Sequence, residues 1–140
     1  MQSPKVLVRD FMHPVQYIFQ LDTSVEEIVK TLAKNKVVGG PVVDADQKLV
    51  GFITEQNCIK QMLNNTYYCD SHEVASDIMR HDPLFVSPED DVLQLAEGML
   101  KKRPKIYPVV EDSRIVGMIT RADVLKALSL AKKDICSVKP

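Results

Sequence analysis

The stretch IVGMITRADVLKAL (residues 115–128) has a near copy earlier in the chain, LVGFITEQNCIKQM (residues 49–62). The two share a Val-Gly pair, an Ile-Thr pair and a later lysine in the same register. The similarity continues upstream, where Pro-Val-Val occurs at 41–43 and again at 108–110. A stretch of this length written twice predicts a chain built from two copies of one structural unit.

Each copy contains an apolar stripe with the spacing of an amphipathic helix. The stripes are Val25, Ile28, Val29, Leu32, Ala33 in the first copy and Val92, Leu95, Ala96, Met99, Leu100 in the second. Thr23 and Glu26 predict a capping box at the start of the first helix. Ser87 is a candidate cap for the second helix, with Pro88 at its first position.

The remaining elements of each copy follow from short apolar runs and turn residues. Pro-Val-Val, a polar turn and then LVGFIT or IVGMIT predict a β-hairpin. A second helix follows each hairpin (57–63 and 123–131), and a short strand precedes each first helix (17–20 and 84–87). Each copy therefore has the predicted order β-α-β-β-α.

We predict a mixed α/β (α+β) fold in which repeats at 8–64 and 74–131 pack into one pseudo-two-fold symmetric module. One copy has too few elements to bury a core by itself, so the copies should share one. The linker 65–73 is polar but holds two tyrosines, and we expect it on the surface, partly docked. Residues 132–140 form a short tail.

The composition excludes several classes of protein. The 140 residues carry a net charge of −1, without the basic excess of a nucleic-acid binder. No apolar run reaches the roughly 18–20 residues of a membrane span, and the N-terminus lacks a signal-peptide core, so we expect a cytoplasmic protein. Three cysteines and three histidines show no metal-ligand spacing, and no catalytic triad or glycine-rich phosphate loop can be read.

Two β-α-β-β-α copies, each with Pro-Val-Val, a turn and Gly-h-h-Thr-x-x-Asp (h apolar), resemble a tandem pair of cystathionine-β-synthase (CBS) domains. The resemblance covers about residues 8–130, and Asn57 departs from it where the second copy has Asp123. It implies two clefts between the repeats that bind adenosine-containing ligands, a regulatory role and a homodimer.

The residues themselves offer two readings of Thr120-x-x-Asp123. One is a helix cap and nothing more, which Thr54-x-x-Asn57 would also satisfy. The other adds a ligand: free amides at a helix N-terminus suit a phosphate, and an ionised carboxylate accepts from ribose hydroxyls. An amide at Asn57 would hold the diol less well, which predicts one competent and one weaker cleft.

The resemblance indicates which residues would line each cleft. The predicted ligand site comprises Asp123, Thr120, Met118, Arg121, Lys105, Tyr17, Val37 and Val38, and the weaker cleft comprises Thr54, Asn57 and Phe52. Lys101 and Lys102 also suit a helix C-terminus, where cations complement the dipole. The first copy has Val38 opposite Lys105 and Glu55 opposite Arg121, so it lacks these cations.

We therefore predict a stand-alone, non-enzymatic module that senses AMP, ADP or ATP and signals to a separate, unknown effector protein. S-adenosylmethionine and NAD fit less well, no cofactor or metal is required, and no nucleic-acid or membrane partner is expected. A ligand-free interaction domain with degenerate sites is the first alternative. A metal protein or minor enzyme using His13, His81 and the cysteines is the second.

Overall fold

The fold is described from a computed structural model, which describes residues 6–64, 72–101 and 105–137. Contacts divide the chain into two compact units. Unit 1 comprises residues 1–15 and 84–140, and unit 2 comprises residues 16–83. Each unit is a mixed helix and sheet structure, as the sequence predicts, and each is described by itself.

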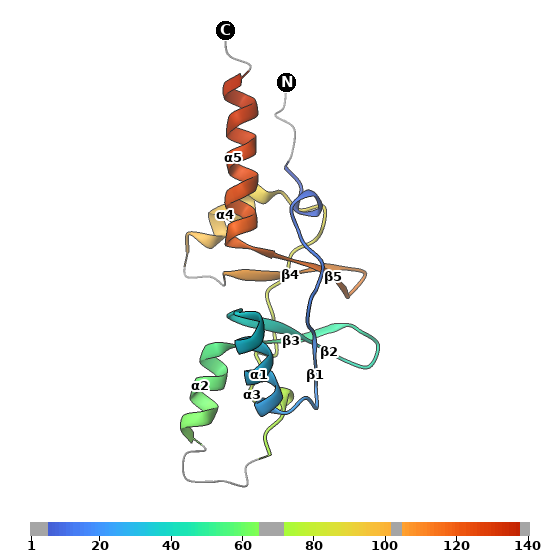
Figure 1. Cartoon of the computed structure of the whole chain (residues 1–140). Helices are drawn as coiled ribbons and strands as arrows, with labels where there is room; N and C mark the ends of the chain where they lie inside the picture. Colours follow the sequence, from blue (N-terminus) through green and yellow to red (C-terminus); the bar gives the residue numbers. More distant parts are fainter. Residues whose placement is uncertain (1–5, 65–71, 102–104, 138–140) are drawn as a thin grey trace. The chain divides into compact units, whose positions relative to one another are not determined.

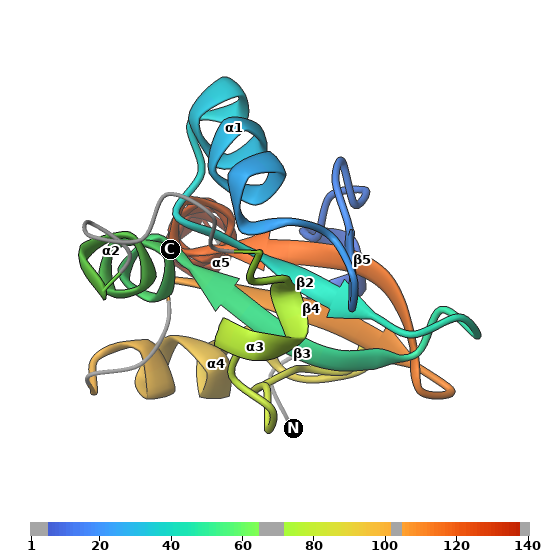
Figure 2. The same ribbon diagram turned by 90° about the horizontal axis from the view of Figure 1, so that it is seen from below.

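Unit 2 is built on a three-stranded sheet in the order β1 (Phe19–Gln20), β2 (Gly39–Val43) and β3 (Leu49–Thr54). The β2–β3 pair is the predicted hairpin, and β1 pairs with β2 in parallel. The helices are α1 (Val25–Asn35), α2 (Glu55–Asn64) and the short α3 (Ala75–Ile78). Figure 2 shows all three helices around the β2–β3 hairpin.

Unit 1 repeats this plan with the hairpin of β4 (Ile106–Glu111) and β5 (Arg114–Thr120). A single-turn helix η1 (Val8–Asp10) comes from the N-terminus, and the helices α4 (Val92–Met99) and α5 (Arg121–Ser137) follow later in the chain. In Figure 1, α4 and α5 lie on the same side of the β4–β5 hairpin, and the blue N-terminal segment lies beside it.

The two sequence repeats exchange their leading segments. Met12-His13 of the first repeat belongs to unit 1, where His13 and Met118 exchange two backbone hydrogen bonds of 2.9 Å. Arg80 of the second repeat belongs to unit 2 and pairs in the same way with Phe52, at 2.9 and 3.1 Å. Each hairpin therefore gains an extra edge contact from the other repeat.

The exchange also determines the composition of the two hydrophobic cores. Val8 of the first repeat is fully buried in the unit 1 cluster with residues such as Val109 and Ile119. Ala75 and Met79 of the second repeat are buried in the unit 2 cluster. The sequence predicted one core shared by the two copies, whereas the structure has one hydrophobic cluster in each unit, and each cluster contains residues of both repeats.

A methionine-on-glycine contact accompanies each exchanged segment. The position of a Cβ at Gly51 is occupied by the Met79 side chain, with Cγ only 2.9 Å away and the Arg80 carbonyl oxygen at 3.0 Å. The matching Gly117 faces Met12 Sδ and the His13 carbonyl oxygen, both at 3.0 Å. The repeated Val-Gly pair is therefore explained by close packing of the exchanged segment.

The caps predicted for the first helix of each copy, Thr23 and Ser87, were wrong. The α1 cap is Ser24, whose hydroxyl accepts from Glu27 N–H, while Thr23 accepts from Gln20 N–H. The α4 cap is Asp91, which accepts from Leu93 N–H. Residues 87–90 instead form a turn closed by Asp90 N–H and the Ser87 carbonyl, because Asx and Ser side chains also stabilise turns.

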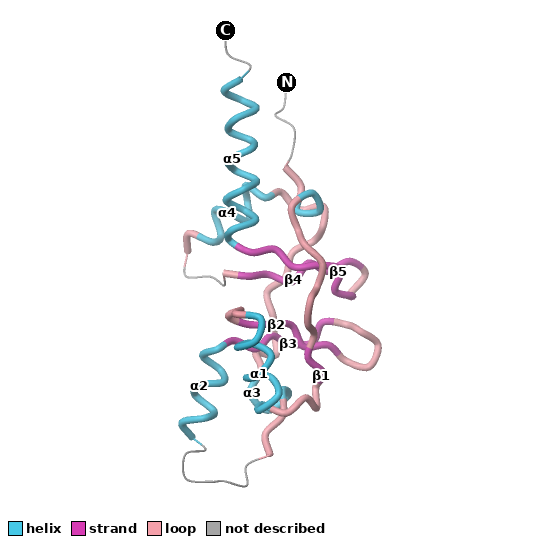
Figure 3. The backbone as a smooth tube through the Cα atoms, viewed as in Figure 1, coloured by secondary structure: helices cyan, strands magenta, loops and turns pink. Residues whose placement is uncertain are grey.

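The predicted strands before the first helices are shorter than expected. Of residues 17–20, only Phe19 and Gln20 form a strand, and residues 84–87 contain only a bridge between Val86 and Val109. Figure 3 draws most of the chain before β1 as loop. The linker 65–71 and Lys102 lie outside the described residues.

The α4 helix also ends earlier than its apolar stripe. Leu100 is the C-terminal cap of α4 and is 89% exposed, although the stripe placed it on the buried face. The helix therefore leaves a large apolar side chain on the surface of unit 1.

Gly51→Ala should destabilise the protein by about 1–3 kcal/mol, because the new methyl group overpacks the Met79 contact. Gly98→Ala is the matched control, since a Cβ at this α4 glycine meets nothing within 4 Å. It should be neutral or stabilise by up to about 1 kcal/mol. Urea unfolding of both variants measures the difference, and equal midpoints would contradict the packing argument.

Candidate functional site

A strand runs directly into a helix at the end of each hairpin. Thr120 ends β5 and Arg121 begins α5, and Thr54 and Glu55 occupy the same places between β3 and α2. In unit 1, Asp123 Oδ2 accepts from the Thr120 N–H at 2.9 Å and from its hydroxyl at 3.0 Å. The Asp123 N–H donates back to Thr120 Oγ1 at 3.2 Å. The helix cap predicted from the sequence is therefore present.

The Asn57 motif has the same geometry. Asn57 Oδ1 accepts from Thr54 N–H at 2.9 Å and from the Thr54 hydroxyl at 3.0 Å, and Asn57 N–H donates to Thr54 Oγ1 at 3.2 Å. One carboxylate or amide oxygen is enough for the cap. Capping therefore does not explain why the two copies differ at this position.

The first amides of α5 are mostly engaged, which corrects the expectation of a freely exposed helix N-terminus. Arg121 N–H donates to the Lys105 carbonyl at 3.0 Å, and Asp123 N–H is held by Thr120. Among the described residues, the Ala122 N–H has no hydrogen-bond partner outside α5. An anion at this end would therefore depend mainly on side-chain cations.

A third donor distinguishes Asp123 from Asn57. His13 Nδ1 lies 2.9 Å from Asp123 Oδ2, and the side chains are 36% and 24% exposed, respectively. A carboxylate has no proton to give, so Nδ1 carries the donated hydrogen. His13 was not predicted as part of the site, because its contact partner is 110 positions away in the sequence. Its place after Met12 in the repeated segment was the available signal.

Unit 2 has no such donor on Asn57 among its described residues. Arg80, which pairs with β3 as His13 pairs with β5, directs its Nε to Asp82, with 3.2 Å to both the carbonyl oxygen and Oδ1. Among the described residues, the Asn57 side chain therefore accepts only the two hydrogen bonds from Thr54 that cap the helix. The histidine contact is specific to unit 1.

The side-chain atom that the cap leaves free is an acceptor in Asp123 and a donor in Asn57. The hydrogen bonds to Asp123 all converge on Oδ2, so Oδ1 is an available acceptor in the described chain. In Asn57 the oxygen is used by the cap, which leaves Nδ2, a donor. Asp123 thus offers hydroxyl groups one acceptor oxygen rather than two, and Asn57 offers them none that is free.

The two predicted cations are adjacent in unit 1. Lys105 is exposed just before β4, and its carbonyl is bonded to the N–H of Arg121, the exposed first residue of α5. In unit 2 the Val38 carbonyl accepts from Glu55 N–H at 2.8 Å in the same way. The backbone geometry is therefore repeated, and only the unit 1 end carries positive side chains.

Met118 and Phe52 are buried, and their backbone polar groups are bonded to the exchanged segments. Met118 is 2% exposed and both its backbone polar groups are bonded to His13. Phe52 is 7% exposed, and its backbone is bonded in the same way to Arg80. Their predicted contact with a ligand stays a prediction, and in Met118 it is restricted to a small exposed edge.

The predicted residues Tyr17, Val37 and Val38 lie in unit 2. The Tyr17 hydroxyl donates to the Gly39 carbonyl at 2.6 Å, and its ring packs against Gly40, where any side chain would collide with it. Burial raises the pKa of Tyr17 to about 12, because the ionised phenolate would lose solvation. Tyr17 therefore has a clear structural role, and its ligand contact, like those of the two valines, stays a prediction.

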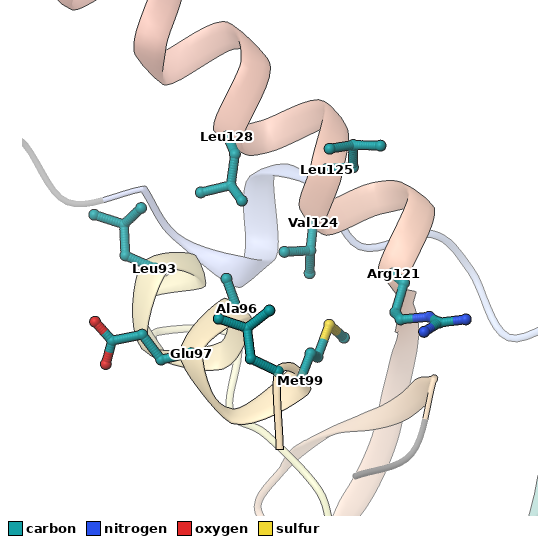
Figure 4. A pocket seen from close by; sticks show the side chains of 9 residues that line it. Leu93, Ala96, Glu97, Met99, Arg121, Val124, Leu125 and Leu128 are labelled. Carbon is teal, nitrogen blue, oxygen red and sulfur yellow. The ribbon is translucent and has the colours of Figure 1, made fainter. Parts of the chain in front are cut away.

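Each unit also has an apolar hollow between its two long helices. In unit 1 this hollow, of about 570 Å³, lies between α4 and α5, and Figure 4 shows Leu93, Met99, Val124 and Leu128 around it. Arg121 lies at the start of α5 at its edge. The hollow of unit 2, about 350 Å³, is lined by corresponding α1 and α2 residues, including Ile59, Met62 and Leu63.

No described helix has the length and apolar character needed to cross a bilayer. Among the same residues, no group of three or more His, Cys, Asp or Glu side chains is arranged to hold a metal ion.

Comparison with known proteins identifies the repeated unit. The family model of the CBS domain matches twice, at residues 8–64 and 75–130. The chain belongs to the CBS domain family. These two matches together cover most of the chain, and they confirm the tandem pair predicted from the repeated motif.

Solved CBS-pair structures have the same fold. The structure of CBSX2 from Arabidopsis thaliana in complex with AMP has a TM-score of 0.77 and 29% identity, covering 90% of this chain and 98% of that one. The CBS domain pair of protein MJ0100, in complex with 5′-methylthioadenosine and S-adenosyl-L-methionine, has a TM-score of 0.76 and 28% identity over 90% and 98% of the chains.

Longer relatives carry the pair as one part of a larger protein. The A-adding tRNA nucleotidyltransferase of Aquifex aeolicus is 30% identical over 131 residues, which are 94% of this chain and 15% of that enzyme. The chain likewise spans less than half of an uncharacterized protein of Methanocaldococcus jannaschii.

Asp123→Ala should lower the free energy of unfolding by about 1 kcal/mol, because Thr120 loses its capping partner. Asp123→Asn should cost less, since Asn57 shows that an amide oxygen makes the same bonds. Asn57→Ala removes the same capping bonds but no histidine contact, so it should cost no more than Asp123→Ala. Urea unfolding without ligand measures all three, and an unchanged Asp123→Ala midpoint would contradict the cap.

Proposed function

We propose that this CBS pair is a non-enzymatic regulatory module that binds an adenosine-containing ligand at the Asp123 motif of unit 1. One observation carries the proposal: the cap needs only one oxygen, and the second oxygen of Asp123 is left as an acceptor in the first turn of α5. This turn begins with the exposed Arg121, whose N–H is bonded to the carbonyl of the exposed Lys105. A ribose hydroxyl can donate to this oxygen, and Lys105 and Arg121 suit a phosphate.

Relatives support the chemical class of ligand. CBSX2 was solved with AMP, and the MJ0100 pair was solved with 5′-methylthioadenosine and S-adenosyl-L-methionine. These ligands share adenosine and differ in charge. In this chain, the cations of unit 1 favour AMP, ADP or ATP over 5′-methylthioadenosine and S-adenosyl-L-methionine.

The Asn57 motif of unit 2 should bind the same ligands weakly or not at all. Its free side-chain atom is a donor, and Glu55 and Val38 replace the two cations. A phosphate near Glu55 would meet a like charge. We therefore expect one ligand per chain.

AMP should stabilise the wild-type protein, by about 2.7 kcal/mol at a hundredfold excess over Kd, because it binds only the folded state. Asp123→Ala should weaken AMP binding about tenfold or more through loss of a charge-assisted hydrogen bond. Calorimetric titration and thermal unfolding with AMP, ATP, adenosine and S-adenosylmethionine test both expectations.

Asn57→Ala is the matched control, since it removes the same capping bonds in the other unit. It should keep wild-type AMP affinity although it loses its helix cap. No binding of any adenosine compound to the wild type would contradict the proposal. That result would favour the alternative of a ligand-free interaction domain in which both motifs act as caps.

We infer that a second copy of the chain covers the helical faces. Leu100 and Leu125 of unit 1 are 89% and 69% exposed, and Ile59 and Leu63 of unit 2 are 59% and 68% exposed. Apolar patches of this kind indicate an interface. The unit 1 hollow also carries Glu97 and Arg121, opposite charges that suit contact between identical surfaces.

Leu125→Glu should convert a wild-type dimer to monomers, because it places a charge in the apolar contact. Lys126→Glu, on the next, exposed residue of α5, changes charge outside the hollow and should leave the dimer intact. Sedimentation velocity gives the masses. A monomeric wild type, or a dimer that survives Leu125→Glu, would contradict the inference.

The output of the module would be a ligand-dependent change in its surface, read by a separate effector protein in the cytoplasm. A ligand changes that surface only if it binds one arrangement of the protein better than another. The effector and the location stay predictions from the sequence.

A further inference from the structure

His13 is the one described side chain that joins the Asp123 cap from a distant part of the sequence. Its Nδ1–H is fixed on Asp123 Oδ2 at 2.9 Å, and its backbone is fixed by the two hydrogen bonds to Met118. The ring is therefore held in one orientation by contacts at both ends. With Nδ1 used, Nε2 is the nitrogen left to meet another molecule.

The unengaged nitrogen can change its hydrogen-bonding character. In the neutral ring with hydrogen on Nδ1, Nε2 is an acceptor, and in the protonated ring it becomes a charged donor. Nδ1–H donates to Asp123 in both states, and the positive charge of the protonated ring strengthens this bond. Histidine is the side chain whose charge ordinarily changes between pH 5 and 8.

We propose that His13 contacts the ligand of the Asp123 site and selects a phosphorylated ligand when its ring is protonated. The inference rests on the proposed function. The 36% exposure of the His13 side chain leaves part of the ring accessible, and its neighbour Asp123 offers the free Oδ1 acceptor. A phosphate oxygen would accept from the protonated Nε2, whereas a neutral ring offers a phosphate no donor.

The surrounding charges are consistent with an anion at this position. Arg121 at the start of α5 and Lys105 before β4 add positive charge, with Lys126 further along α5. On η1, Arg9 is paired with Glu89, and Asp10 is exposed. Asp123 is the one carboxylate in direct contact with the ring among the described residues.

The other unit provides an internal comparison. Its Arg80 occupies the place of His13 but is bonded to Asp82 instead of to Asn57. A permanently charged side chain turned toward its own loop cannot act as a proton-dependent ligand contact. The proposed selection is therefore a property of unit 1.

The test is calorimetric titration of the full chain with AMP and with adenosine at pH 6, 7 and 8. His13→Asn is the main variant, because its amide can still donate to Asp123 from the position of Nδ1 but gains no proton. His13→Gln is a second variant with a non-titrating polar group near the position of Nε2. Urea unfolding at each pH establishes that both variants fold.

Wild-type affinity for AMP should rise about three- to tenfold more than that of His13→Asn between pH 8 and pH 6, the gain of a charged donor on phosphate. Adenosine affinity should follow one pH profile in wild type and variant. The ionisation of AMP itself is common to all proteins compared, so it cancels in this difference.

Two results would overturn the inference, and only the second would also overturn the proposed function. Coincident AMP profiles for wild type, His13→Asn and His13→Gln would overturn the role of His13 and leave the nucleotide site intact. Absence of AMP and adenosine binding to the wild type at every pH would overturn the proposed function and this inference with it.

Discussion

The backbone pairing of each exchanged segment with the other repeat's hairpin is the constraint on which both units depend. Two hydrogen bonds join His13 to Met118 at the edge of one hairpin, and two join Arg80 to Phe52 at the edge of the other. The pairing holds Met12 and Met79 over the glycines of the second strands. It also brings Val8 or Ala75 into a core formed largely by the other repeat. Without it, each hairpin would lose an edge contact and part of its core.

The same constraint connects the fold to the candidate site. Because His13 is anchored to β5 through its backbone, its side chain reaches the first turn of α5, where Asp123 caps the helix. The site of unit 1 is therefore assembled from the N-terminal segment and the last hairpin and helix of the chain. The equivalent position in unit 2 has the same backbone pairing but different side-chain contacts, since Asn57 bonds to Thr54 and Arg80 bonds to Asp82.

At the start of the second helix of each copy, the side chains differ but the capping and backbone hydrogen bonds are the same. The caps at Thr120 and Thr54 have the same hydrogen-bond lengths, so either Asp or Asn preserves the helix start. The changes from Glu55 to Arg121 and from Val38 to Lys105 likewise leave the backbone bonds unchanged. The backbone geometry is therefore common to both copies, and the side-chain charge at this position differs between them.

The sequence by itself determined the two copies, the hairpins, the helical stripes and the Thr-x-x-Asp caps, because these features depend on spacing between neighbours along the chain. Caps at Thr23 and Ser87 failed since Ser24 and Asp91 compete for the same role at nearby positions. Only the tertiary structure decided the exchange of leading segments, the burial of Met118 and the bond between His13 and Asp123. A backbone pairing between residues more than a hundred positions apart leaves no periodicity in the sequence, so it is set by packing and hydrogen bonding in the folded chain.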